Sequence, residues 1–96
     1  MIIKKQKLDG VYLIESEPFE DKRGRFSRHF CKEEFNKAGI SFEIKQTNIS
    51  ENKKSKTLRG FHFQTPPYAE NKILSCMKGS IHDIVLDLRT KSKTYL

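Results

Sequence analysis

The residues most able to do chemistry in this sequence lie in the segment 57–67, TLRGFHFQTPP. His62 stands there between two phenylalanines, with Arg59 before it and Gln64 after it. A histidine side chain titrates at about pH 6.5, so it can take up and return a proton at neutral pH. Alternation along a strand would put His62 and Gln64 on one face and Arg59 on the other, unless a bulge at Gly60 re-aims the arginine. Composition alone favours the plainer alternative, a histidine packed in the core.

Metal binding is the obvious alternative use of a histidine within a β-rich segment. A His-x-His site would need a second imidazole where Gln64 stands, and a neutral amide is a poor transition-metal ligand. Cys31 and Cys76 lack CxxC spacing, and no other group of His, Cys, Asp or Glu has the spacing of metal ligands. We therefore expect no metal site, and two reduced cysteines rather than a disulfide framework.

Two basic residues could act on an anion. Lys72 opens the segment that follows the Pro-Pro turn. If Lys72 faces the same cavity as His62, its ammonium group could stabilise a developing oxyanion. Arg23 precedes Gly24 in an expected turn, where its guanidinium could contact a phosphate. The plainer interpretation of both side chains is exposure to solvent.

Two pairs of polar residues would share strand faces. Gln46 and Asn48 are two residues apart, so one face of a strand would present both of them to a sugar or a base. Asp83 and Asp87 fall on one face of the last expected strand, where either carboxylate could orient a histidine. A solvated strand edge is the plainer interpretation of each pair.

Alternation and turn residues predict an all-β protein with one short helix near residues 32–38. The helix is the segment CKEEFNKAG, which ends at Gly39. A turn is expected near residues 21–24, followed by a strand with Phe26 and Phe30. The other expected strands are 11–16, 41–50, 57–65, 72–77 and 80–89. Six or so short strands separated by regular turn signals indicate a sandwich or a barrel.

Composition describes one small domain with a basic surface. The 96 residues are 35% hydrophobic and 32% charged. No apolar run approaches the roughly 18 residues of a membrane-spanning helix, and the first residues do not resemble a secretory signal. The net charge of +7 favours an anionic partner, unless it is only a lysine-rich solvated surface. Charge alone does not choose among nucleic acid, an acidic lipid and a phosphorylated small molecule, although the basic residues do not interleave with aromatic ones as in RNA-binding proteins. We expect no nucleic-acid partner and no membrane partner.

Four blocks of the sequence together resemble a known family. FEDKRGRF, QTNIS, LRGFHFQTPPYAENKI and KGSIHDIVLDLRTKSKTY look like successive signature blocks of the dTDP-4-dehydrorhamnose 3,5-epimerase family. The resemblance implies a cupin-type jelly roll, of which residues 1–96 would be a single, truncated N-terminal portion. It also implies cofactor-free epimerisation of a dTDP-4-keto-6-deoxyhexose, as in deoxysugar supply of the dTDP-L-rhamnose type, by a cytoplasmic homodimer.

The resemblance also assigns roles to several of the candidate residues. His62 matches the general base of the family, and Lys72 and Arg59 match positions that line the reacting sugar. Gln46 and Asn48 match substrate-contacting positions. The family's catalytic acid and its histidine-orienting aspartate would both lie beyond position 96. A catalytically inactive module that binds a sugar nucleotide or forms a dimer is therefore the alternative function.

Four further positions complete this comparison with the family. Arg23 matches an arginine that contacts the diphosphate from a neighbouring subunit, and Asp83 matches an acidic position near the site. Arg28 stands where the family commonly has a glutamate that helps to bind the nucleotide. Tyr95 does not match the family's catalytic tyrosine. The resemblance therefore leaves the nucleotide and the keto sugar open.

Overall fold

The first hairpin of the chain is a short antiparallel pair. The computed structural model describes all 96 residues and pairs β1 (Ile2–Lys5) with β2 (Tyr12–Glu15), with Ile3 opposite Ile14. The turn between them closes through a hydrogen bond from the Val11 N–H to the Leu8 carbonyl at 3.1 Å. Gly10 has a φ of +82° in this turn, a conformation that favours glycine. The strand predicted at residues 11–16 is therefore confirmed.

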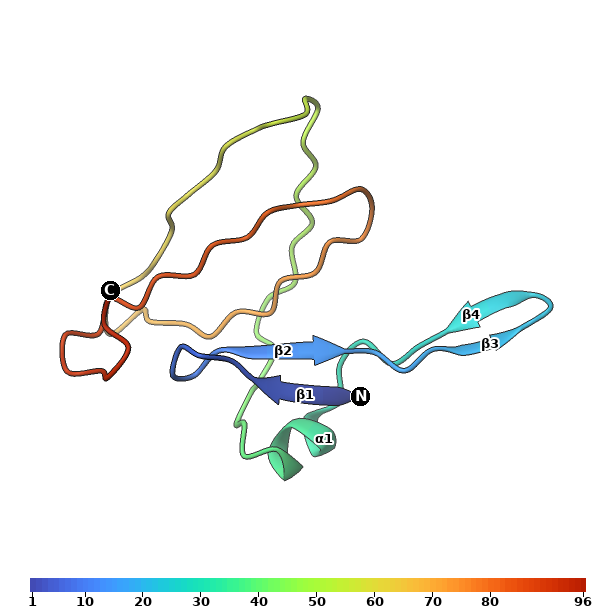
Figure 1. Cartoon of the computed structure of the whole chain (residues 1–96), viewed down its shortest axis with the longest axis horizontal. Helices are drawn as coiled ribbons and strands as arrows, with labels where there is room; N and C mark the ends of the chain where they lie inside the picture. The colour runs from blue at the N-terminus through green and yellow to red at the C-terminus, as the bar shows by residue number, and fades with distance from the viewer.

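A second hairpin projects away from the first (Figure 1). It pairs β3 (Phe19–Asp21) with β4 (Gly24–Phe26) in antiparallel register. Asp21 holds the turn, because its carboxylate accepts a hydrogen bond from the Arg23 N–H at 2.8 Å. Gly24 begins β4 with a φ of +139°. The predicted turn near residues 21–24 is confirmed, although the strand ends at Phe26 and does not reach Phe30.

The helix α1 (Lys32–Lys37) carries the small aromatic core of the chain. Phe35 is only 2% exposed, and its ring centroid lies 4.9 Å from that of Phe30 and 6.0 Å from that of Phe42. The helix has acidic residues in its first turn and Lys37 in its last, which suits the helix dipole. Gly39 follows the helix with a φ of +78°. The predicted helix is confirmed.

After Ile40 the chain forms no further helix or strand and runs in wide, extended loops (Figure 1). The strands expected at 41–50, 57–65, 72–77 and 80–89 are therefore wrong for this structure. An extended segment becomes a strand only when a neighbour pairs with its N–H and C=O groups. Backbone N–H groups beyond residue 40 donate to backbone carbonyls only at positions 68, 92, 95 and 96. The regular structure is β-rich with little helix, as the all-β prediction requires.

The chain as a whole exposes more surface than a compact domain of its mass. Its accessible surface is 9658 Å², whereas the usual scaling for 11.3 kDa gives about 5,700 Å². The Cα radius of gyration is 15.6 Å, compared with about 12 Å for a compact chain of this length. Phe35 and Asp87 are the only buried residues. Most of the apolar side chains after residue 40 therefore lie open to solvent.

Candidate active-site residues

His62 lies exposed in the extended segment between two loops of the chain. Its imidazole makes no hydrogen bond or ion pair, and the neighbouring Phe61 and Phe63 are 65% and 66% exposed. The core histidine favoured by composition is therefore wrong here. Gly60 has a φ of +106°, but no neighbouring strand pairs with this segment, so neither the expected strand nor a bulge in it forms.

Lys72 is linked to the His62 segment through Glu70. The Lys72 Nζ lies 3.1 Å from the Glu70 Oε1, which also accepts a hydrogen bond from the Gln64 Nε2 at 3.3 Å. Glu70 thus brings together Lys72 and the residue two positions after His62, on either side of the Pro-Pro turn. Sequence analysis did not single out Glu70. The signal available was a lone carboxylate between two segments that carry candidate residues.

Arg23 lies at the turn of the projecting hairpin. Its Nη2 is 2.7 Å from the Asp21 Oδ2, and the Arg23 side chain is 90% exposed. This contact lowers the pKa of the Asp21 carboxyl below its ordinary value. In Figure 1 the hairpin points away from the extended segments that hold the other candidate residues. The structure therefore does not bring Arg23 to His62 within one chain.

The remaining predicted site residues stay apart from one another. Gln46, Asn48, Arg59 and Asp83 are all exposed, and no hydrogen bond or ion pair joins any of them to another candidate residue. They lie on the extended segments that lack strand pairing. Sequence alternation placed Asp87 on the same strand face as Asp83, but the two side chains differ in burial, since Asp83 is exposed. Asp87 is buried, and the Arg89 guanidinium holds the pKa of its carboxyl far below the usual range.

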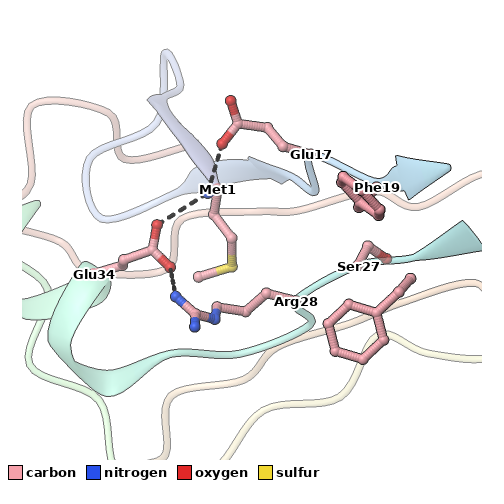
Figure 2. Close-up of a pocket in the computed structure, with 7 residues that line it drawn as sticks. Met1, Glu17, Phe19, Ser27, Arg28 and Glu34 are labelled. Carbon is pink, nitrogen blue, oxygen red and sulfur yellow. Dashed lines mark hydrogen bonds and ion pairs between the residues drawn. The ribbon is translucent and has the colours of Figure 1, made fainter.

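Arg28 belongs to a charged cluster beside a cavity of about 260 Å³ (Figure 2). Its Nη1 lies 2.9 Å from the Glu34 Oε2, and the other oxygen of Glu34 accepts a hydrogen bond from the Met1 ammonium at 3.0 Å. The Met1 ammonium also donates to the Glu17 carboxylate at 2.8 Å. The Arg28 contact lowers the pKa of Glu34, and the pKa of Arg28 is raised in turn.

Two phenylalanines line the same cavity. Phe19 and Phe26 face each other across the second hairpin and are 73% and 78% exposed. Exposed rings beside a guanidinium can stack on a planar ring that carries hydrogen-bond acceptors. Phe26 was expected on a strand, but neither ring was among the predicted site residues. The signal available was a phenylalanine at each end of a short hairpin.

A larger cavity, of about 340 Å³, separates β2 from the segment 73–76. His29 and Ser75 meet at its edge, where the Nε2 and Oγ atoms are 3.3 Å apart. Cys76 also lines this cavity, and both cysteines are free thiols. No group of three or more His, Cys, Asp or Glu side chains lies close enough to hold a metal ion.

Comparison with known proteins decides the family. Residues 5–96 match the sequence model of dTDP-4-dehydrorhamnose 3,5-epimerase. The chain belongs to this family. The predicted resemblance to the family is therefore confirmed over nearly the whole sequence. No solved structure matches the chain. No helix of this family member is long and apolar enough to cross a membrane.

Curated relatives from several organisms are similar in sequence to this chain. A dTDP-4-dehydrorhamnose 3,5-epimerase from Shigella flexneri is 35% identical over 96 residues, which are 99% of this chain and 52% of that protein. One from Methanothermobacter thermautotrophicus is 36% identical over 91 residues, 95% of this chain and 48% of that protein. A dTDP-4-dehydrorhamnose 3-epimerase from Streptomyces niveus is 34% identical over 89 residues, 92% of this chain and 42% of that protein. The chain spans about half the length of these relatives.

Proposed function

We propose that this chain is the N-terminal portion of a cupin-type jelly roll that epimerises a dTDP-4-keto-6-deoxyhexose in deoxysugar synthesis of the dTDP-L-rhamnose type. The family match over residues 5–96 carries this proposal, because it includes the segment with Arg59 and His62 and the lysine ten residues after His62. The names of the relatives include both 3,5-epimerases and a 3-epimerase. Inversion at C3 is common to both names, so C3 is the centre where we expect proton exchange first.

The proposed chemistry needs a base, a cation and an acid. Hydrogens at C3 and C5 are both α to the C4 ketone, so each can leave as a proton while the ketone becomes an enolate. We assign the base to His62, whose exposed imidazole makes no internal contact that would compete with substrate. Return of a proton to the opposite face then inverts the carbon. We propose that no cofactor takes part, because the adjacent ketone already accepts the electron pair.

Lys72 is the proposed cation for the enolate oxygen. Its ammonium now pairs with Glu70 at 3.1 Å, and both side chains are more than 40% exposed. An exposed ion pair of this kind contributes little stability, so Lys72 can exchange Glu70 for a developing oxyanion at small cost. Arg59 would add positive charge to the same end of the substrate. Gln46 and Asn48 would hydrogen-bond the sugar or the base.

We propose that the chain forms a homodimer. The second hairpin would extend from one subunit to the substrate site of the other. The hairpin carries Arg23 at its turn, with the exposed rings of Phe19 and Phe26 at its base. In a dimer, Arg23 of one copy would contact the diphosphate of a substrate bound by the other copy. The large exposed surface of the chain supports an extensive interface, because obligate dimers bury about 2,000–5,000 Å². The free thiols and the nucleotide-linked substrate also lead us to propose a cytoplasmic location.

Deuterium uptake from D₂O into a dTDP-4-keto-6-deoxyhexose, followed by NMR, tests the assignment of the base. We expect slow exchange at C3 with the chain, and His62→Ala should reduce that exchange by about 10²–10⁴-fold. His82→Ala is the matched control, because His82 is also an exposed histidine and is not assigned to the proposed site. Exchange that persists unchanged in His62→Ala would remove His62 from the mechanism. Binding of dTDP without any exchange would instead favour the inactive binding module.

A further inference from the structure

The last ten residues fold into a turn around the carboxylate of Asp87. This carboxylate is buried, and it accepts hydrogen bonds from the Arg89 N–H at 3.0 Å and the Thr94 hydroxyl at 2.7 Å. The Arg89 guanidinium adds two more, each at 2.9 Å and one to each carboxylate oxygen. The backbone closes the turn through the Leu96 N–H, which donates to the Asp87 carbonyl at 3.0 Å. No buried polar side-chain atom in the chain is left without a partner.

This turn contacts the opposite end of the chain at a single backbone position. The Arg89 guanidinium donates to the Asp9 carbonyl, and the Asp9 N–H donates to the Thr94 Oγ1 at 3.1 Å. Both backbone groups of Asp9 are thus paired with side chains 80 and 85 residues away in sequence. Figure 1 shows the two turns beside each other, one at each end of the colour scale. The Asp9 carboxylate lies 3.7 Å from the Lys5 Nζ.

Two side chains therefore connect Asp87 to the Asp9 backbone, and each makes a hydrogen bond to both residues. The guanidinium of Arg89 bridges the Asp87 carboxylate and the Asp9 carbonyl, which its planar array of donors allows and a lysine ammonium reproduces poorly. The hydroxyl of Thr94 donates to Asp87 and accepts from Asp9. A Cβ at Gly10 would make only an ordinary contact, 3.8 Å from the Arg89 Nη1, so glycine is favoured there by its φ of +82° and not by lack of space.

We propose that residues 87–96 form a latch that holds the turn between β1 and β2 by its backbone at Asp9, with the buried Asp87 as the centre of the latch. The latch ties the end of the extended segment 80–89 to the first hairpin. Opening it would release that segment, which includes Asp83. The hydrogen bonds of the latch go to the Asp9 backbone and none goes to its carboxylate, so removal of that side chain should leave the latch closed.

Hydrogen exchange of the Asp9 amide, measured on the full chain by mass spectrometry with residue-level fragmentation, tests the latch. Thr94→Val removes the hydroxyl with little change in shape. It should speed exchange at Asp9 by roughly three- to tenfold, because the Asp9 N–H loses its one hydrogen bond to Thr94. Thr94→Ser retains the hydroxyl and should restore slow exchange. Asp9→Ala should keep the amide protected, because the backbone N–H remains.

The Phe35 amide, which donates to the Cys31 carbonyl at 3.0 Å within the helix region, reports whether each variant keeps its fold. Its exchange should be the same in all variants. Arg89→Lys gives a second way to open the latch and should speed Asp9 exchange without affecting Phe35. Equal Asp9 exchange in the wild type, Thr94→Val and Arg89→Lys would overturn the proposal. Loss of protection in Asp9→Ala would show that the side chain, not the backbone, makes the contact.

Discussion

The exposed surface of the chain leads to a quantitative prediction about its unfolding. An unfolded chain of 11.3 kDa exposes about 16,400 Å², so folding to the 9658 Å² of this structure buries about 6,700 Å². A compact domain of the same mass would bury about 10,700 Å². The urea m-value is proportional to the area exposed on unfolding. For the isolated monomer it should therefore be about 0.6 of the value for a compact domain of equal length.

Diluting the protein should reveal the unfolding behaviour of the isolated monomer. At about 1 µM we expect a broad, weakly cooperative transition by circular dichroism, together with binding of a hydrophobic dye. At about 100 µM, association should cover apolar side chains such as Ile81 and Ile84, which are 60% and 59% exposed, and the transition midpoint should rise. Sedimentation velocity on the same samples would show the oligomers. A sharp monomeric transition with a full-sized m-value at both concentrations would refute the reasoning.

Three further predictions concern the core, the ligand and the latch. Phe35→Ala should cost about 3–5 kcal/mol and remove the helical circular-dichroism signal, whereas Phe35→Leu should retain most of it; equal signals from the two variants would contradict this. Calorimetry should show dTDP affinity that falls with added salt and falls less steeply in Arg23→Ala, whereas equal binding of random DNA would favour a nucleic-acid partner. Because Arg89, Ser92 and Thr94 lower the pKa of Asp87, its stabilising contribution is complete above the unfolded-state value of about 3.9 and is lost as the pH falls through the lower folded value. Protection of the Asp9 amide should accordingly persist at mildly acidic pH and weaken only in stronger acid, and an Asp87→Asn variant should lack this pH dependence.

Local chemistry explains which elements the sequence predicted correctly. The helix ends at a glycine with a positive φ, and the second hairpin turns on an aspartate that accepts from the backbone two residues later. Each of these signals lies within a few residues of the structure that it determines. The strand prediction at residues 11–16 located β2, whereas its partner β1 was not predicted. These elements together occupy the first 37 residues.

Pairing between distant segments explains the predictions that failed. The segment 80–89 alternates as a strand should, yet alternation says which faces can be buried and not which neighbour will supply the ladder. Ile84, Val85 and Leu86 are therefore between 44% and 59% exposed in a segment that looks strand-like by sequence. The latch was missed for the same reason, because no local pattern connects Asp87 to a backbone position near the opposite end of the chain.

The candidate site also combines features set by local sequence with features that depend on distant segments, and this affects the chemistry that it can do. Its positions were predicted from the signature blocks, but its geometry depends on the extended segments. Ordering a residue costs about 1–2 kcal/mol of backbone entropy, so a ligand that aligns the segments around His62 and Lys72 must first overcome that cost. Two features reduce it between these residues: the rigid proline pair at 66–67 and the Glu70 carboxylate that links Gln64 to Lys72. The short stretch from His62 to Lys72 is thus the part of the proposed site closest to a fixed arrangement, so the proposed proton exchange at His62 would need the least reordering of the rest.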